Sequence, residues 1–240
     1  MQIHSASAFV TGANRGIGRA LVQRLLADGA KRVYGTARTQ DEADKLAALD
    51  NRLTGIVMDV TQPSQIAAAA AQARDVTLLI NNAGVLDFGN LLEVDRAKVD
   101  RNFATNFYGT LDVTRAFAPV LEANGGGTIV NLLTLVALAS MPGLSVYNAS
   151  KAAAWSMTQS WRATLAAKNV KVMGVFPGAV DTDMLAGVDM PKTSPADIAA
   201  AICAGLADDR EDVFPDAMSA AVYEQWKTDH KSVERQFALM

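Results

Sequence analysis

The sequence predicts a single α/β domain built on a doubly wound parallel sheet, with helices on both faces. Short β-branched segments alternate with longer amphipathic or alanine-rich segments through most of the 240 residues, and this alternation is typical of a parallel sheet. The short segments show little period-2 alternation of apolar and polar residues, as expected for strands covered on both faces. No linker, charge block or internal repeat divides residues 1–240, so one domain is predicted.

The elements follow in order along the chain. Strands are predicted at 6–11, 32–36, 55–58, 76–81, 128–133 and 170–176, where short apolar runs rich in β-branched residues occur. Helices are predicted at 18–27, 41–49, 64–73, 103–123, 150–168 and 196–206, where longer amphipathic or alanine-rich segments occur. Pro177 and Gly178 end the sixth strand. A short strand is expected around Val213 and Phe214, and the tail from Ala217 is expected to be helix and coil.

Composition excludes several classes of protein. The chain carries 22 Lys and Arg against 25 Asp and Glu, a formal net charge of −3, which argues against binding to nucleic acid or anionic membranes. No apolar run approaches the ~20 residues of a membrane-spanning helix, and no signal peptide is visible at the N-terminus. A single cysteine, Cys203, excludes an internal disulfide. It fits a reducing compartment, so we expect a cytoplasmic protein.

The two histidines restrict the possible chemistry. His4 and His230 lie near the two ends of the sequence, and we expect both to be exposed. Together with Cys203 they are too few for a zinc site, so we expect no metal. A Ser-His-Asp or Cys-His hydrolase would depend on one of them. The acid–base group of any enzyme with this sequence is therefore expected not to be histidine.

A glycine-rich turn links the first predicted strand to the first helix. Gly12, Gly16 and Gly18 permit a tight turn, close approach of the backbone to a pyrophosphate, and tight packing of helix on strand. The helix N-terminus adds N–H groups and a dipole that favour the anion. The spacing Gly-x-x-x-Gly-x-Gly is a variant of the commoner Gly-x-Gly-x-x-Gly, and such turns also use glycine for structural reasons alone. The turn indicates a dinucleotide site.

With this turn, the chain resembles the NAD(P)-dependent short-chain dehydrogenase/reductase family, close to its ketoacyl-carrier reductases. The further segments that carry the resemblance are Asp59-Val60, Asn81-Asn82-Ala83-Gly84, Tyr147-Asn148-Ala149-Ser150-Lys151 and Pro177-Gly178-Ala179-Val180-Asp181-Thr182. The similarity runs from about residue 6 to residue 182. It implies a Rossmann-like fold and oxidoreductase activity of the ketoreductase or alcohol dehydrogenase type. It also implies a homodimer or homotetramer formed through the helices at 103–123 and 150–168.

The resemblance assigns the cofactor contacts to the glycine turn and the other matching segments. The expected cofactor-binding residues are Gly12, Asn14, Arg15, Gly16, Ile17, Gly18, Arg38, Asp59, Val60, Asn81, Ala83, Gly84, Tyr147, Lys151, Pro177, Gly178, Val180 and Thr182. Asp59 and Val60 would meet the adenine, and Val180 and Thr182 the nicotinamide amide. The segment 81–84 is also an ordinary turn at the end of a strand.

Charge favours NADP over NAD as the cofactor. An acidic residue after the second strand would bond the ribose 2′-OH of NAD and repel a 2′-phosphate. Segment 35–39 holds no carboxylate. Arg38 offers a planar fork for the phosphate, and Arg15 can approach it from the glycine turn. A surface arginine can equally be no more than a solvated charge.

Tyr147 and Lys151 are the predicted proton-transfer pair. They lie four positions apart, so on a helix they share one face. The ordinary pKa of tyrosine, near 10, is too high for efficient proton transfer at neutral pH, and we expect the neighbouring ammonium group to lower it. Tyr147 would then be the acid in ketone reduction and the base in alcohol oxidation. By resemblance, Lys151 also binds the nicotinamide ribose.

The resemblance adds two further catalytic positions. The family's catalytic serine falls on Thr134, whose hydroxyl can still hold a carbonyl oxygen, although its methyl group restricts the rotamer. Thr134 is either a working replacement, which we favour, or the mark of a weakened site. Asn106 matches the residue that holds a water between the lysine and solvent. A simple surface position on the helix is the alternative for Asn106.

The predicted substrate lid spans about 183–195. By resemblance it borders the substrate together with apolar side chains, which are Leu135, Met141, Leu144, Ala179 and Met184. They favour a small-to-medium hydrophobic ketone or secondary alcohol, although the same side chains could pack inside the core.

Two classes of function remain open. One is an NADP-dependent oxidoreductase, and the other is a non-catalytic NADP-binding sensor or scaffold, which the replaced serine permits. The intact Tyr147, Lys151 and Asn106 favour the enzyme.

Overall fold

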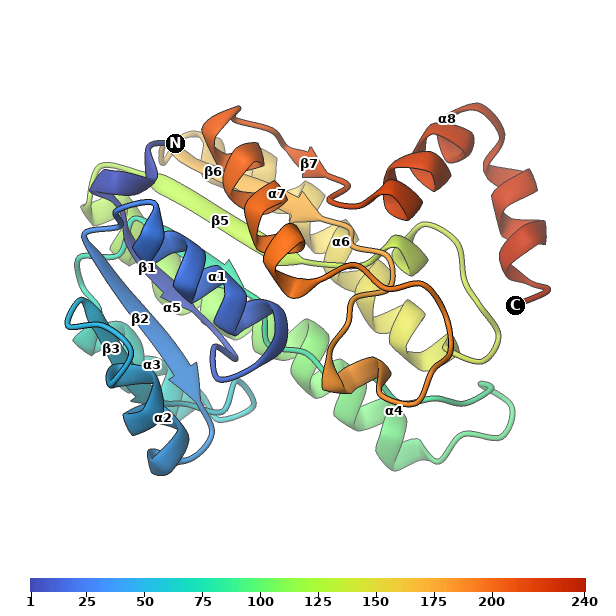
Figure 1. The fold of residues 1–240 in the computed structure, drawn as a ribbon, viewed down its shortest axis with the longest axis horizontal. Helices are drawn as coiled ribbons and strands as arrows, with labels where there is room; N and C mark the ends of the chain where they lie inside the picture. The colour runs from blue at the N-terminus through green and yellow to red at the C-terminus, as the bar shows by residue number, and fades with distance from the viewer.

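The computed structural model describes residues 1–240 and contains one seven-stranded parallel sheet (Figure 1). Its strands are β1 Ser7–Val10, β2 Arg32–Ala37, β3 Leu53–Val57, β4 Leu78–Asn81, β5 Gly127–Leu132, β6 Val170–Val175 and β7 Asp212–Val213. They lie in the order β3-β2-β1-β4-β5-β6-β7. The order reverses direction between β1 and β4, and in such sheets ligands bind beyond the carboxyl ends of the strands near this reversal. The predicted doubly wound parallel sheet is confirmed.

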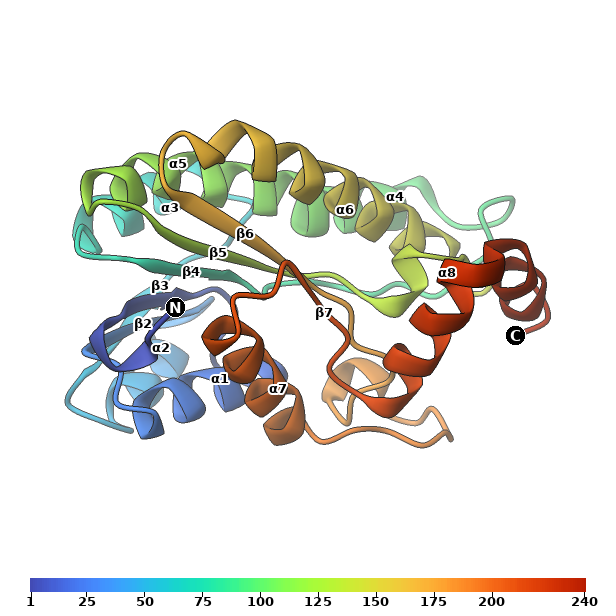
Figure 2. The ribbon, with the colours of Figure 1, turned by 90° about the horizontal axis from the view of Figure 1, so that it is seen from above.

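Helices cover both faces of the sheet. They are α1 Gly16–Ala27, α2 Gln40–Ala47, α3 Pro63–Gln72, α4 Arg96–Phe103, α5 Thr110–Ala123, α6 Ser145–Ala166, α7 Pro195–Ala207 and α8 Ala217–Phe237. Figure 2 shows α1, α2 and α7 on one side of the sheet and α3, α5 and α6 on the other. The kinked helix α8 extends from one end of the molecule and carries the C-terminus (Figure 1).

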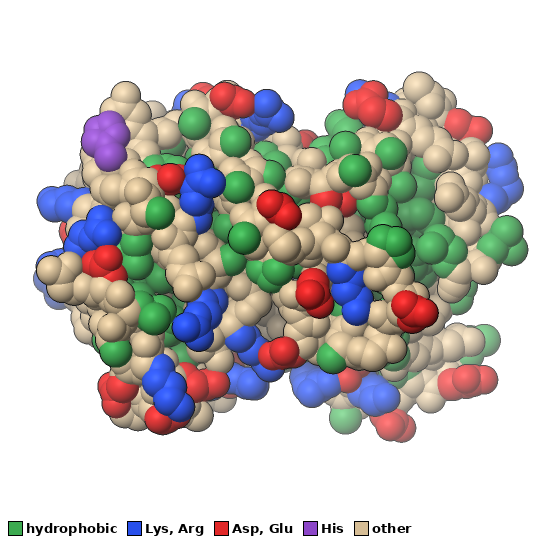
Figure 3. Space-filling view, viewed as in Figure 1, with side chains coloured by type: hydrophobic (Ala, Val, Ile, Leu, Met, Phe, Trp, Pro, Cys, Tyr) green, Lys and Arg blue, Asp and Glu red, His purple; other side chains and the backbone are tan.

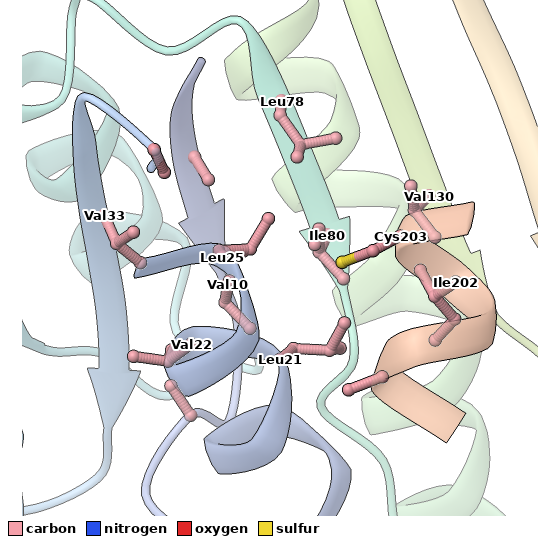
Figure 4. Close-up of a cluster of buried hydrophobic side chains, with 14 of the residues drawn as sticks. Val10, Leu21, Val22, Leu25, Val33, Leu78, Ile80, Val130, Ile202 and Cys203 are labelled. Atoms are coloured by element: carbon pink, nitrogen blue, oxygen red, sulfur yellow. The ribbon is translucent and has the colours of Figure 1, made fainter. Parts of the chain in front are cut away.

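Each face of the sheet has its own hydrophobic core. Phe9 and Val10 are neighbours in β1 and are both fully buried, but they belong to opposite cores. Because successive side chains of a strand point to opposite faces, two covered faces require apolar residues at consecutive positions. Figure 4 shows the core beneath α1 and α7, where Leu21, Ile80 and Cys203 converge.

Two predicted helices begin several residues earlier in the structure, and the C-terminal tail is more helical than expected. The helix expected at 103–123 begins at Arg96, and its segment Ala104–Gly109 is a π-helical turn. Helix α4 could not be predicted from hydrophobic periodicity, because its only buried residue is Asn102 and it has no apolar stripe. The helix expected at 150–168 begins at Ser145, behind Leu144, which provides no side-chain cap. The tail expected to be helix and coil is helical from Ala217 to Phe237.

Several expectations from composition can be compared with the structure. His4 and His230 are exposed, as predicted. Cys203 is buried, and burial raises the pKa of its thiol to about 12. Positive and negative side chains are interspersed on the face in Figure 3. None of the helices has both the length and the apolar character needed to cross a bilayer, and His, Cys, Asp and Glu side chains do not gather into a metal-binding group.

Candidate active site

The glycine turn between β1 and α1 has the geometry of an anion cradle. Gly12 and Gly16 adopt φ values of +63° and +51°, a left-handed conformation that favours glycine. A Cβ atom on Gly18 would lie 2.2 Å from the carbonyl oxygen of Gly12. No side chain caps the N-terminus of α1, and its first turn carries no acidic residue. The helix end is therefore free to receive a pyrophosphate.

The turn lies against two other segments that were expected to bind the cofactor. A Cβ atom built on Gly12 would lie 3.2 Å from the Cα atom of Ala83, and one built on Gly16 would lie 3.1 Å from Cγ2 of Thr182. The Thr11 hydroxyl accepts hydrogen bonds from the N–H groups of Asn82 and Ala83, both at 2.9 Å. These contacts bring the carboxyl ends of β1 and β4 together, and the site fits a dinucleotide.

The amide group of the Asn81 side chain forms hydrogen bonds that link the sheet to the helices on one of its faces. Its amide donates to the Thr114 hydroxyl at 3.0 Å and to Asn131 Oδ1 at 2.9 Å, and Asn131 donates in turn to the Thr158 hydroxyl at 2.9 Å. This buried chain joins β4 and β5 to α5 and α6. The Oδ1 atom of Asn81 is buried and has no hydrogen-bond partner, so of the polar atoms of this side chain this oxygen alone is unpaired.

The residues expected at the adenine lie at the same edge of the sheet, after β3. Asp59 Oδ1 accepts hydrogen bonds from the N–H and hydroxyl groups of Thr61, both at 2.8 Å. Val60 is buried beside the π-helical turn, where a Cβ atom on Gly109 would lie 2.8 Å from Val60 Cγ2. The small residue at position 109 lets this loop pack against the helix.

Charged side chains surround the expected position of the ribose phosphate. The Thr36 hydroxyl and carbonyl at the end of β2 accept hydrogen bonds from Gly12 N and Ala13 N, which places Arg38 beside the turn, exposed and without a salt bridge. Arg15 instead pairs with Asp183 of the expected lid at 3.1 Å, and both side chains are exposed.

Sequence reasoning missed the carboxylate of Glu42 in this region. It lies in the first turn of α2 and accepts a hydrogen bond from the Asn14 amide at 2.7 Å. Its position after the Thr39 N-cap matches a capping box, but the sequence alone did not place it beside the glycine turn. The negative charge of Glu42 would repel a ribose 2′-phosphate bound beside the glycine turn.

Tyr147 and Lys151 share the first turns of α6, as their spacing predicted. Both are buried. Lys151 Nζ donates to the carbonyl oxygen of Leu132, the last residue of β5, at 2.6 Å. It lies 5.9 Å from the centre of the Tyr147 ring. A Cβ atom on Gly84 would lie 3.6 Å from Nζ, so the turn after β4 reaches the lysine.

The prediction that Lys151 lowers the pKa of Tyr147 is wrong for this arrangement. Burial raises the pKa of Tyr147 to about 12, because a phenolate loses solvation, and the neighbouring Thr134 hydroxyl opposes that rise. Burial also lowers the pKa of Lys151 to about 8. At neutral pH, Tyr147 keeps its proton and Lys151 carries its charge.

Thr134 follows β5 and faces the same site. Its side chain is buried beside Tyr147, and its hydroxyl makes two long hydrogen bonds, donating to the Pro177 carbonyl at 3.5 Å and accepting from Val136 N at 3.4 Å. These distances are at the weak end of hydrogen bonding. The hydroxyl is therefore free to exchange them for a stronger partner.

Asn106 lies in the π-helical turn and is buried, which excludes the surface alternative. Its Oδ1 accepts from Val85 N, and its amide donates to Val85 O and to the Ser150 hydroxyl, all at 2.9 Å. The side chain thus holds the segment after Gly84 against α6. Single π-helical turns are frequent at functional sites. No sequence signal marked this one.

The loop after β6 closes the cofactor side of the site. Pro177 O accepts a hydrogen bond from Leu135 N at 2.9 Å, and Gly178 N donates to Asp216 Oδ2 at 2.8 Å. Val180 pairs with Thr193 in an isolated bridge. This bridge closes the loop containing the expected lid, which includes the short helix Asp183–Leu185.

The expected substrate residues divide into two groups. Leu135 is buried in one apolar cluster with Tyr147, and Met141 packs against that cluster. Leu144 precedes α6 and Ala179 lies in the loop after β6, both half-buried, whereas Met184 is exposed. The same cluster contains Val233 and Phe237 of α8, which sequence reasoning did not connect to the site.

Comparison with known proteins finds relatives that match most of the chain. The family model described as short chain dehydrogenase matches residues 6–192. Sorbitol dehydrogenase of Cereibacter sphaeroides is 32% identical over 194 residues, which cover 79% of this chain and 76% of that protein.

Two solved structures also align along most of the chain. A short-chain dehydrogenase from Burkholderia cenocepacia in complex with NADP is 36% identical, with a TM-score of 0.94 over 99% of both chains. One from Burkholderia phymatum in complex with NAD is 25% identical, with a TM-score of 0.86 over 98% of this chain and 96% of that one.

Proposed function

The chain belongs to the short-chain dehydrogenase/reductase family of oxidoreductases, and on that premise we propose that it interconverts a small-to-medium hydrophobic ketone and its secondary alcohol, using NADP. One observation carries the proposal. Tyr147, Lys151 and Thr134 lie together at the carboxyl ends of the strands, beside an uncapped glycine turn.

The chain's own residues would hold the cofactor as follows. The free N–H groups at the start of α1 bind the pyrophosphate, and Asp59 and Val60 lie at the adenine. Val180 and Thr182 meet the nicotinamide, which supplies the hydride when the cofactor is bound. Lys151 binds the ribose hydroxyls next to it.

Preference for NADP rests on the charges at the end of β2. Ala37 occupies the place of an acidic ribose partner, Arg38 is exposed and unpaired, and Arg15 of the glycine turn pairs with Asp183. Their fork-shaped guanidinium groups suit a phosphate. Glu42 disfavours a phosphate there, and Arg15 has to leave its exposed partner Asp183 to reach one; we infer that Arg38, joined by Arg15, outweighs the Glu42 carboxylate. The structural relative from Burkholderia cenocepacia binds NADP, which agrees with this inference.

Proton transfer is assigned to Tyr147. Because its pKa is raised, the hydroxyl is protonated at neutral pH and can donate to the oxygen of a ketone as charge develops there. The Thr134 hydroxyl donates a second hydrogen bond to that oxygen. Lys151, which is charged at neutral pH, lies 5.9 Å from the centre of the tyrosine ring. The arrangement suits reduction at neutral pH.

The apolar surroundings set the class of substrate. Leu135, Met141, Leu144, Ala179 and Met184 offer no charged group to a substrate. Apolar side chains with few convergent polar groups are typical of pockets for small hydrophobic ligands. The two hydroxyls, on Thr134 and Tyr147, supply the polar contacts for one carbonyl oxygen.

A spectrophotometric screen tests the proposal. Ketones and secondary alcohols are offered to the protein with NADPH, NADH and their oxidised forms, and absorbance of the reduced nicotinamide is followed. We expect turnover of hydrophobic ketones with NADPH, and weaker binding of NADH.

The Arg38→Asp variant tests the cofactor assignment in the same screen. It should reverse the cofactor order, because each lost phosphate contact is worth about 1.5–3 kcal/mol. Equal dissociation constants for NADPH and NADH in the parent would refute the cofactor preference. Tight NADPH binding without turnover of any compound would favour the sensor alternative.

A further inference from the structure

Helix α8 consists of two segments separated by a kink. Asp229 has φ −149° and ψ 78°, values outside the helical region, and its Oδ1 accepts a hydrogen bond from Ser232 N at 2.9 Å. This bond caps the start of the second segment, residues 230–237, as an N-cap does. The second segment is thus a short helix with its own beginning and its own direction.

The first segment of α8 is fixed to the body of the protein. Asp216 forms a capping box with Ser219 and also accepts the hydrogen bond from Gly178 N. The rings of Phe214 and Tyr223 stack with centroids 3.8 Å apart, and Trp226 packs edge-on against Trp155 at 5.9 Å. The position of the kink is therefore set relative to the loop after β6.

The second segment of α8 buries its apolar side against the catalytic region. Val233 is 0% exposed and Phe237 is 3% exposed, and both belong to the cluster of Leu135 and Tyr147. The other side of this short helix carries Glu234 and Gln236, which are exposed. Figure 3 shows hydrophobic side chains gathered around α8 on the right of the view.

Tyr147 is buried in the same apolar cluster as this segment. The residue is only 8% exposed, yet the oxygen of a substrate has to reach its hydroxyl for proton transfer. No residue of the expected lid at 183–195 belongs to the apolar cluster that contains Tyr147. The buried members of this cluster that are far from Tyr147 in the sequence are Val233 and Phe237 of α8.

We propose that residues 230–237 form a substrate-facing wall of the site, and that Val233 and Phe237 set the size of the group a ketone can carry beside its carbonyl. The proposal rests on the proposed function for its substrate class. Phe237 fills space that a bulky substituent would need, so small substituents fit beneath the wall and larger ones collide with it. Removing the ring opens that space.

Kinetics on a series of ketones tests the wall. Methyl ketones with alkyl groups of increasing length are compared in the parent, Phe237→Ala and Val233→Ala, with Gln236→Ala as the matched control on the exposed side. We expect Phe237→Ala to raise kcat/KM for long relative to short ketones at least tenfold, chiefly through KM. Dissociation constants for NADPH should stay within twofold. An unchanged ratio in both apolar variants would overturn the proposal.

A second measurement does not depend on turnover. Acetylation of tyrosine by N-acetylimidazole is followed by mass spectrometry of peptides, with Tyr108, which is 56% exposed, as the internal reference. We expect Tyr147 to react at least tenfold faster in Phe237→Ala than in the parent or Gln236→Ala. Equal rates would refute the wall, whereas faster acetylation without turnover of any ketone would leave it standing and refute the proposed function.

The Phe237→Leu variant provides a test of the proposal in case Phe237→Ala fails to fold. Leucine keeps most of the buried apolar volume, so this variant should fold and should show the same change of substrate preference, smaller in size. A folded leucine variant with the parent's preference and the parent's acetylation rate would also overturn the proposal.

Discussion

Replacing Thr134 with valine removes one hydroxyl from the candidate active site and keeps the shape of the side chain. Thr134 is the position at which the chain departs from its family, where the resemblance implies serine. If its hydroxyl holds the substrate carbonyl, the departure is a working replacement. If it does not, Thr134 is only a buried residue at the end of β5.

The structure separates the two consequences of this substitution. The hydroxyl now makes bonds of 3.5 Å and 3.4 Å, which are long, so their loss should cost about 1 kcal/mol of stability or less. A bond that tightens as charge develops on the carbonyl oxygen contributes about 2–4 kcal/mol to transition-state stabilisation. That free energy corresponds to about a 30- to 900-fold fall in kcat/KM.

The assay compares kcat/KM for the parent, Thr134→Val and Thr134→Ser on the best ketone from the screen. Thermal unfolding of each variant checks that the fold is intact. Thr134→Ser should keep the parent's activity or exceed it, because the hydroxyl remains and gains rotamer freedom. A valine variant as active as the parent would refute the reasoning, and the carbonyl would then be held by another group.

Further expected outcomes concern the proton donor, the lysine, the glycine turn and the cofactor. Tyr147→Phe should abolish turnover and leave NADPH binding nearly intact, since it removes the transferable proton; substantial activity by the spectrophotometric assay would point to a different acid. Because burial lowers the pKa of Lys151 to about 8, its charge is present below that pH and lost above it, so ketone reduction should decline as pH rises through about 8. A pH–rate profile that stays level to about pH 10, near the ordinary pKa of lysine, would contradict this. Gly18→Ala should destabilise the protein by about 1–3 kcal/mol, because the new methyl group meets the Gly12 carbonyl; an unchanged melting temperature would show that the turn adjusts. Glu42→Gln should tighten NADPH binding more than NADH binding in fluorescence titrations, and equal effects on both would place the 2′-phosphate elsewhere.

Local patterns in the sequence were enough to predict most of the fold. The strand segments around Phe9, Tyr34 and Ile129 are largely apolar at consecutive positions. This pattern distinguishes buried parallel strands from strands with one solvent-exposed face. The glycines at 12, 16 and 18 marked the start of α1, because only a tight turn explains three of them there. Helix ends were less well predicted, as α4 and the first turn of α6 carry neither an apolar stripe nor a capping side chain.

The sequence by itself determined the parallel sheet, the glycine turn and the shared helical face of Tyr147 and Lys151, because each depends on residues close together in the chain. Only the tertiary structure decided how these groups behave. The pKa of Tyr147 rises instead of falling because the residue is buried in a cluster that includes α8, about ninety positions further along the chain. Asn106 holds Val85, and Glu42 meets Asn14, through the packing of separate helices against the ends of strands. Burial and long-range contacts depend on where distant segments pack, and no local pattern carries that information.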